Sequence, residues 1–324
     1  MRSIRIFCII KGHVEDCPKV QEIVVKKRML LVINPKSGRG EIARKLYKVI
    51  ELFSRSEYEV TVYPTAAAGD AYTRIRECAC NFDLIVCAGG DGMMNEAVNA
   101  YMCMENPPKL AYIPCGTTND FAITLKIPRK IMESARAILN GQPRKIDIGV
   151  LDGKYFSYVA AFGLFTNIPY TTDQNAKNIL GRIAYFLEGI KHLNNISSVD
   201  CVVNIDGEII RGNFMLGIIA NSTSIGGFRF NVEKNAIIDD GLFEVVFVRS
   251  PKNILELQEI IGLLLGTQAN SHLYIQRTAK KVEFSSGQPC DWTVDGEFGG
   301  RHKDIVIENL HQTLNIILPP ALDQ

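Results

Sequence analysis

Three short segments in the first half of the chain carry residue types that suit the binding of phosphate groups. They read Asn34-Pro-Lys-Ser-Gly-Arg-Gly40, Gly89-Gly-Asp-Gly92 and Gly116-Thr-Thr-Asn-Asp120. Glycines let the backbone approach a ligand closely, and the free N–H groups at the start of a helix favour an anion. The hydroxyl groups of Thr117 and Thr118 add further donors. The three segments together predict a site for the phosphates of a nucleotide.

Each segment also has an ordinary structural explanation. The first is not a Walker A loop, because no Gly-Lys-Ser/Thr run stands at the required spacing. Asp91 could cap the helix that follows it, and Thr117 or Thr118 could cap the next one. All three segments, however, follow successive apolar runs, and parallel sheets bind ligands at the carboxyl ends of their strands. This shared position favours binding over three unrelated caps.

An alternation of strands and helices supplies the framework for these segments. Strands are predicted at 30–33, 58–63, 83–88 and 110–113. Helices are predicted at 41–55, 70–80, 93–102 and 131–140, with another opening at 116–119. Such alternation is typical of a parallel sheet covered by helices on both faces.

The pattern changes near residues 142–145. Beyond them, short strands are predicted at 155–161, 199–205, 213–221, 243–248, 281–285, 304–308 and 313–318. Asp-Gly pairs at 152, 206 and 240 suit tight hairpin turns. Helices are predicted at 181–193 and 251–265. The fold class is therefore α/β plus all-β: a three-layer α/β domain followed by an antiparallel β-sandwich with inserted helices.

Composition excludes several classes of protein. The 324 residues are 47% hydrophobic and 22% charged, which is ordinary for a globular protein and excludes general disorder. The formal net charge of +1 gives no basic excess, so we expect no nucleic-acid partner. Nine cysteines without a Cys-x-x-Cys pair indicate reduced thiols in a cytoplasmic protein rather than a zinc site. No apolar run reaches the length of about 18 residues that a transmembrane segment needs.

The three segments extend into longer motifs whose order resembles a known family. The motifs are Asn34-Pro-x-Ser-Gly-x-Gly40, Gly89-Gly-Asp-Gly92-x-x-Asn95-Glu96, Pro114-x-Gly116-Thr-Thr-Asn-Asp120, Ile146-Asp147-Ile-Gly149, Asp239-Asp-Gly-Leu242 and Val294-Asp-Gly-Glu297. The set is similar to that of the soluble bacterial diacylglycerol kinases, lipid kinases related to sphingosine kinases and more distantly to NAD kinases. The resemblance runs from about residue 29 to the C-terminus.

The resemblance implies two domains with the active site in the cleft between them. Residues 29–145 would form the NAD-kinase-like domain that binds ATP, and residues 146–324 the β-sandwich that binds the lipid, the last residues returning to the first domain. Residues 1–28 would lie outside the fold, and we hypothesise that Val25 is the native start, so that residues 1–24 are absent from the native protein.

The resemblance also assigns residues, with ATP and Mg²⁺ as cofactors. Asp295 would be the general base that activates the lipid hydroxyl, although an Asp-Gly pair is also an ordinary hairpin turn. The residues expected to bind the cofactors are Asn34, Ser37, Gly89, Gly90, Asp91, Gly92, Asn95, Glu96, Gly116, Thr117, Thr118 and Asn119. The residues expected around a structural Mg²⁺ are Asp147, Ile237, Asp240 and Leu242, the second and last through main-chain oxygens.

The expected function is phosphate transfer from ATP to the hydroxyl of a membrane lipid, most simply diacylglycerol, which gives phosphatidic acid. The enzyme would work in the cytoplasm, at the inner membrane surface, with Lys126, Arg129 and Lys130 or Lys280 and Lys281 as candidate membrane contacts. The sequence leaves the oligomeric state open, a homodimer included.

Two alternatives stay open. One is a kinase for a soluble acceptor such as NAD. The other is a nucleotide- or lipid-binding regulator with weak or no turnover, because Met93 stands where the family usually has Thr or Ser.

Overall fold

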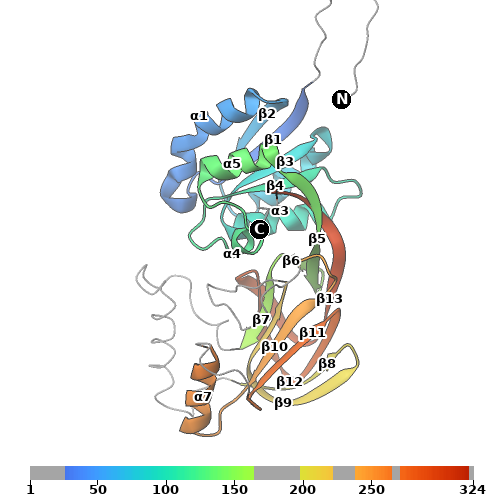
Figure 1. Cartoon of the computed structure of the whole chain (residues 1–324). Helices are drawn as coiled ribbons and strands as arrows, with labels where there is room; N and C mark the ends of the chain where they lie inside the picture. The colour runs from blue at the N-terminus through green and yellow to red at the C-terminus, as the bar shows by residue number, and fades with distance from the viewer. Residues whose placement is uncertain (1–25, 164–197, 222–237, 265–270, 321–324) are drawn as a thin grey trace, which may run out of the picture.

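The computed structural model describes residues 26–163, 198–221, 238–264 and 271–320. Figure 1 shows two lobes stacked along one long axis, with helices around a sheet in the first lobe and mainly strands in the second. Residues 1–25, the predicted helix at 181–193 and Ile237 lie outside the described residues.

The first lobe is built on a parallel sheet. Strands β1 (Lys27–Ile33), β2 (Tyr58–Pro64), β3 (Leu84–Gly89) and β4 (Lys109–Pro114) are arranged in the order β2-β1-β3-β4. Every one of these neighbouring pairs is parallel. β3 is buried along its whole length, which explains its continuous apolar sequence. The predicted parallel sheet is confirmed.

Helices cover both faces of this sheet. Helices α1 (Glu41–Ser54) and α5 (Ile131–Asn140) pack with β1, β3 and β4 in one core cluster. Helices α2 (Asp70–Cys78) and α3 (Asp91–Met102) bury their apolar sides in the cluster on the other face. The short helix α4 (Asp120–Thr124) begins only at Asp120, so residues 116–119 form a turn and not the first turn of a helix.

The second lobe is antiparallel. Its strands are β5 (Gln142–Leu151), β6 (Lys154–Phe156), β7 (Val159–Gly163), β8 (Val199–Ile205), β9 (Glu208–Ala220), β10 (Phe243–Arg249), β11 (Tyr274–Ala279), β12 (Lys281–Val294) and β13 (Glu297–Leu318). Aromatic side chains form the middle of its core, where the ring centroids of Phe162 and Trp292 lie 5.0 Å apart. Helix α7 (Ile254–Leu264) stands beside the sheet at the end remote from the first lobe (Figure 1).

Two long strands join the lobes. β5 and β13 pair antiparallel from Ile307 with Leu151 to Leu318 with Gln142, and Ile316 of β13 also pairs in parallel with Leu110 of β4. The last strand therefore belongs to both sheets. The change of sequence pattern at residues 142–145 lies inside β5 rather than in a linker.

Two predicted strand assignments need correction. The predicted strand at 155–161 is interrupted between β6 and β7, because the N–H groups of Ser157 and Tyr158 turn toward a carboxylate instead of a neighbouring strand. The predicted strands at 304–308 and 313–318 are one strand, whose register shifts between Leu310 and Leu314. Gln312, with φ of 51°, absorbs this irregularity.

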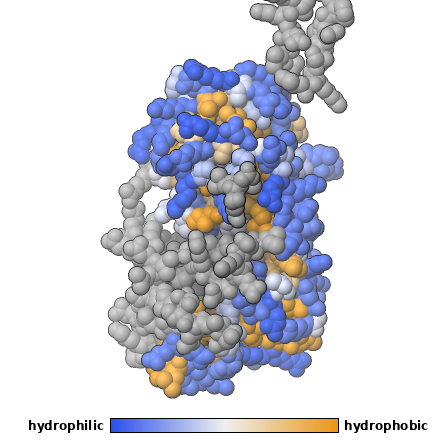
Figure 2. Space-filling model, in the orientation of Figure 1, coloured by the Kyte–Doolittle hydropathy of each residue, from blue (hydrophilic) through white to orange (hydrophobic). Residues whose placement is uncertain are grey.

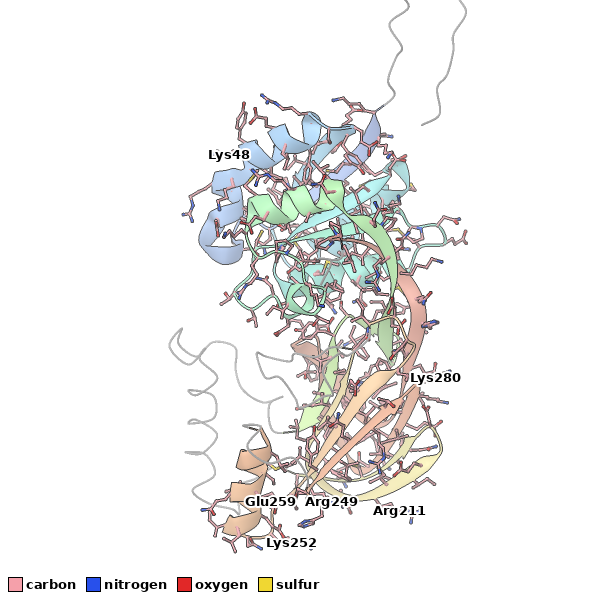
Figure 3. The ribbon with its side chains drawn as sticks, viewed as in Figure 1. Lys48, Arg211, Arg249, Lys252, Glu259 and Lys280 are labelled. Atoms are coloured by element: carbon pink, nitrogen blue, oxygen red, sulfur yellow. The ribbon has the colours of Figure 1, made fainter. Side chains whose placement is uncertain are left out.

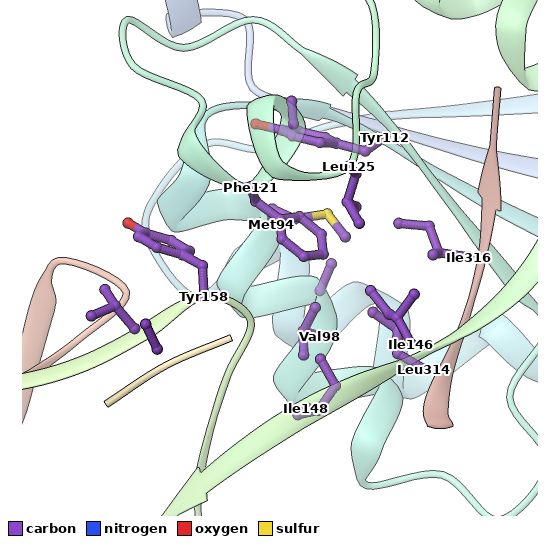
Figure 4. Packing of buried hydrophobic residues seen from close by; sticks show 14 of the residues in the cluster. Met94, Val98, Tyr112, Phe121, Leu125, Ile146, Ile148, Tyr158, Leu314 and Ile316 are labelled. Atoms are coloured by element: carbon purple, nitrogen blue, oxygen red, sulfur yellow. The ribbon is translucent and has the colours of Figure 1, made fainter. Parts of the chain in front are cut away.

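A single apolar cluster continues from one lobe into the other. Figure 4 shows Met94 and Val98 of α3 packed among Ile146 and Ile148 of β5 and Ile316 of β13. This shared core lies at the junction of the lobes, so α3 packs against both. No helix in the described part of the chain combines the length and the hydrophobicity needed to cross a membrane.

Candidate active site

The three glycine-rich turns meet at one edge of the parallel sheet. A Cβ atom on Gly38 would overlap the carbonyl oxygen of Cys115, and one on Gly116 would lie 2.7 Å from the Cα atom of Gly90. The N–H group of Cys115 also donates to the carbonyl of Gly89 at 2.7 Å. Glycine is needed here because the backbones touch. The expected gathering of the turns at the carboxyl ends of their strands is therefore what the structure shows.

Asp91 connects the second turn to the third. Its carboxylate accepts hydrogen bonds from the N–H groups of Asp120, at 3.3 Å, and Phe121, at 3.4 Å. It thus sits at the start of α4, while Gly90 occupies the N-cap position of its own helix α3. Burial raises the pKa of Asp91, and the N–H donors act against this rise. Its role in binding a cofactor stays a prediction.

Three of the predicted site residues carry hydroxyl groups. Among the residues that the structure describes, none forms a hydrogen bond with the hydroxyl groups of Ser37, Thr117 or Thr118. Thr117 is exposed, and its carbonyl accepts a hydrogen bond from Arg129 at 3.1 Å. Asn34 accepts a hydrogen bond from the N–H group of Lys36 at 3.0 Å and so shapes the first turn. These hydroxyls are the donors that the third and first turns offer.

Asn119 supports its turn. Its Oδ1 atom accepts from the N–H of Gly116, at 2.8 Å, and from the hydroxyl of Tyr112, at 3.2 Å, while its amide donates to the carbonyl of Gly116 at 2.8 Å. The residue is buried, and its backbone has a φ of 54°. The side chain of Asn119 thus fixes the backbone of the third turn, and a contact of this residue with the cofactor stays a prediction.

The carboxylate of Glu96 is also engaged within the first lobe. Its carboxylate accepts hydrogen bonds from Gly69 at 2.8 Å, Ala71 at 3.1 Å and Tyr72 at 3.4 Å, all at the N-terminus of α2. It therefore caps a neighbouring helix, whose free N–H groups and dipole favour a negative charge. A contact of Glu96 with the cofactor stays a prediction.

Met93 fills space beneath the second turn. A Cβ atom on Gly89 would overlap the sulfur of Met93, whose side chain is 8% exposed. The position that the family usually fills with a hydroxyl residue is thus a packing position here. Cys115 is also buried, and burial raises its pKa to about 12, so its thiol is not a nucleophile at neutral pH.

Asp295 stands in a hairpin turn between β12 and β13. Asp295 and Gly296 both have positive φ, 48° and 84°, as a type I′ turn requires. The hairpin alternative is therefore correct, but the side chain does more than turn the chain. It is 4% exposed and accepts from the N–H groups of Ser157 at 2.7 Å, Tyr158 at 3.0 Å and Val159 at 3.1 Å.

A fourth hydrogen bond to Asp295 comes from the first lobe. The amide of Asn95, on α3, donates to its Oδ2 atom at 2.9 Å. Burial raises the pKa of Asp295, and the four donors act against that rise. The acid is thus fixed beside Asn95, which lies one helical turn after Asp91 on α3. Asn95 was expected to bind the cofactor, and the structure shows it bound to the acid.

Glu297 was not singled out from the sequence. A Cβ atom on Gly92 would lie 3.4 Å from its Oε1 atom, so the hairpin that carries Asp295 reaches the second glycine-rich turn. The sequence signal was the acid that follows the Asp295-Gly296 pair, at the end of the last motif.

Asp147 forms a separate polar centre between β5 and β13. Its oxygens accept from Gly241 N at 2.6 Å and Gln312 N at 2.7 Å, and one lies 3.0 Å from Nδ1 of His311. Asp240 accepts from the N–H of Leu242 at 3.0 Å. Within the described residues no three acidic, histidine or cysteine side chains gather as a metal site would require. N–H groups therefore satisfy Asp147, and a metal there stays a prediction.

The two lobes match the models of two family domains in turn. Residues 28–151 match the family description "Diacylglycerol kinase catalytic domain", and residues 159–318 match "YegS C-terminal NAD kinase beta sandwich-like domain". The chain is 34% identical over 296 residues to the diacylglycerol kinase of Bacillus subtilis (strain 168), covering 90% of this chain and 97% of that protein.

Two further comparisons agree. A diacylglycerol kinase of Staphylococcus aureus (strain MRSA252) is 33% identical over 297 residues, 91% of this chain and 93% of that one. The crystal structure of a diacylglycerol kinase from Bacillus anthracis (strain Sterne) superposes with a TM-score of 0.72 at 26% identity, covering 91% of this chain and 98% of that chain. The chain belongs to the diacylglycerol kinase family, and it is a lipid kinase.

Proposed function

We propose that this enzyme transfers the γ-phosphate of ATP to the free hydroxyl of diacylglycerol and releases phosphatidic acid and ADP. The observation that carries the proposal is the hydrogen bond from Asn95 to Asp295, because it sets an acid from the second lobe beside the glycine-rich turns of the first. The names of the relatives support diacylglycerol as the acceptor.

The three turns bind the triphosphate in this proposal. The N–H groups of Gly89, Gly90 and Gly92 approach the phosphates, and the hydroxyls of Ser37, Thr117 and Thr118 donate to their oxygens. Asp91 is the residue that would hold Mg²⁺, which neutralises charge on the phosphates as transfer proceeds. Asp147, Asp240 and Leu242 would belong to a second, structural ion.

Asp295 acts as the general base. The lipid hydroxyl donates to the carboxylate beside the Asn95 amide, which stays in place and is the only side chain among the four described donors to the carboxylate. Asp295 takes the hydroxyl proton, the lipid oxygen forms a bond to the γ-phosphorus, and the bond from that phosphorus to the bridging oxygen of ADP breaks.

The proposal is tested by offering the purified enzyme Mg-ATP and three acceptors: diacylglycerol in mixed micelles, sphingosine in the same micelles, and NAD. Mass spectrometry of the products should show phosphatidic acid as the main one. Phosphorylated NAD would support the soluble-acceptor alternative, and ATP binding without any phosphorylated product would support a regulator.

We also propose that the enzyme meets the bilayer with the edge of the first lobe near its turns. The guanidinium of Arg129 donates to the carbonyl of Thr117 in the third turn, and Lys126 precedes Arg129 by three residues. Lys281, by contrast, is paired with Glu283 at 2.9 Å, and Lys280 lies on the outer edge of the second lobe (Figure 3). Ile254 and Leu255, at the start of α7, are exposed, but this helix stands at the end of the second lobe remote from the turns, where Figure 2 shows an apolar patch.

Vesicle sedimentation tests this surface. Lys126→Glu should weaken binding to vesicles that contain anionic lipid, because each basic group near such a surface contributes about 1 kcal/mol. The matched variant Lys280→Glu should bind like the unmodified protein. Equal losses in the two variants would contradict the assignment.

A further inference from the structure

Asn99 lies one turn beyond Asn95 on α3 and contacts the second lobe. Its Oδ1 atom accepts the N–H of Tyr155 at 3.1 Å, and its amide donates to the carbonyl of the same residue at 2.9 Å. The side chain therefore pairs with the backbone of β6 as a neighbouring strand would. Only a carboxamide offers a donor and an acceptor at this spacing.

The same amide fixes the orientation of Asn95. Asn99 Nδ2 donates to the carbonyl of Asn95 at 2.9 Å and to its Oδ1 atom at 3.2 Å. Because Oδ1 of Asn95 faces this donor, its NH₂ group is left for Oδ2 of Asp295, at 2.9 Å, and the carbonyl of Tyr155, at 3.3 Å. The reverse orientation would set an amide oxygen against the carboxylate.

We propose that Asn99 is a positioning residue that docks the phosphate-binding helix onto β6 and directs the amide of Asn95 to Asp295. The inference rests on the proposed role of Asp295 as the base. β6 leads directly into Ser157, Tyr158 and Val159, whose N–H groups hold Asp295. Asn99 therefore fixes both the side-chain donor and the strand that carries the backbone donors.

Among the residues that the structure describes, the charged groups near this contact are few. On α3, Asp91 stands one turn before Asn95. On the hairpin, Glu297 follows Asp295 by two residues and reaches Gly92. On β6, Lys154 donates to the carbonyls of Phe298 and Gly299. The nearby titratable tyrosines are Tyr155 and Tyr158. The hydrogen bond from Asn95 is therefore the main interaction with Asp295 that a change at Asn99 would alter.

The test uses Asn99→Asp in the full chain. The carboxylate keeps an acceptor for Tyr155 but loses the donor, so the amide of Asn95 turns away from Asp295. We expect kcat/KM for diacylglycerol to fall about 10- to 100-fold, as for a misplaced catalytic group. We expect the dissociation constant for ATP, measured by calorimetry, to be unchanged.

The pH profile separates positioning from stability. The loss of one hydrogen bond to Asp295, with a new negative charge nearby, should move the acid limb of kcat/KM upward by about one pH unit. Asn81→Asp adds the same charge on the exposed end of a turn in the first lobe and should leave the profile in place. If Asn99→Asp unfolds, Asn99→Ser, which also cannot pair with both groups of Tyr155, replaces it.

The outcomes are distinguishable. An Asn99 variant that folds and shows the pH profile of the unmodified enzyme overturns the positioning role, while Asp295→Asn stays inactive and the proposed function stands. If Asp295→Asn turns over like the unmodified enzyme, Asp295 is not the base and both proposals fail.

Discussion

Gly90 and Gly116 lie back to back, so that a Cβ atom on Gly116 would be 2.7 Å from the Cα atom of Gly90. Gly116→Ala must therefore push the second and third turns apart. We expect the overpacking to cost about 1–3 kcal/mol, and an equal loss in ATP binding would weaken affinity about 5- to 150-fold. Calorimetric titration with ATP measures this change in affinity. Gly287→Ala, where an added Cβ atom meets nothing within 4 Å, is the control, and equal affinities would show that the turns do not bind ATP together.

Glu96 should matter for stability and not for nucleotide binding. Its carboxylate accepts three N–H groups at the start of α2, so Glu96→Gln removes a charged cap that contributes about 1 kcal/mol. Urea unfolding should show that decrease while the dissociation constant for ATP stays constant. A large loss of ATP affinity in a stable variant would restore the cofactor role.

Met93 should be a packing residue. Its side chain is 8% exposed and lies against Gly89, so Met93→Thr removes buried volume and should lower the free energy of unfolding by about 1–3 kcal/mol. Turnover should not rise, because the backbone N–H at this position is present in both proteins. A variant of unchanged stability and much higher turnover would mean that methionine impairs the site.

The activity should depend on pH through Asp295. A general base works only when ionised, and burial raises the pKa of this carboxyl. The acid limb of kcat/KM should therefore have its midpoint above the ordinary aspartate value of about 3.9. Activity is expected to fall as the pH drops through that midpoint. If Asp295→Glu is active and its acid limb keeps the same midpoint, the limb belongs to another group.

The sequence sufficed to predict the parallel sheet and its turns for a physical reason. Strands such as β3 are buried on both faces and carry unbroken apolar runs. The turns that follow them fall on one edge of any such sheet, so their meeting could be predicted without contacts.

Other features depend on contacts between distant residues. β5 begins with exposed Gln142 and Pro143 and shows no strand pattern, and it forms because β13 pairs with it. The four donors around Asp295 come from segments about 136 to 200 positions away in the chain. The capping role of Glu96 likewise joins two helices 24 to 27 residues apart. Local sequence patterns carry no signal for such pairs.

The most direct test compares Asp295→Asn with Asp206→Asn. Both residues begin Asp-Gly hairpin turns with nearly the same φ, 48° and 46°, and both carboxylates accept backbone N–H groups, Asp206 from Lys280 and Lys281. The two variants therefore suffer the same kind of local change, one beside the glycine-rich turns and one remote from them. We expect Asp295→Asn to lose about 10²- to 10⁴-fold in kcat for diacylglycerol while ATP still binds, and Asp206→Asn to retain kcat. Equal turnover in the two variants would contradict the assignment of Asp295 and the glycine-rich turns as the site of phosphate transfer.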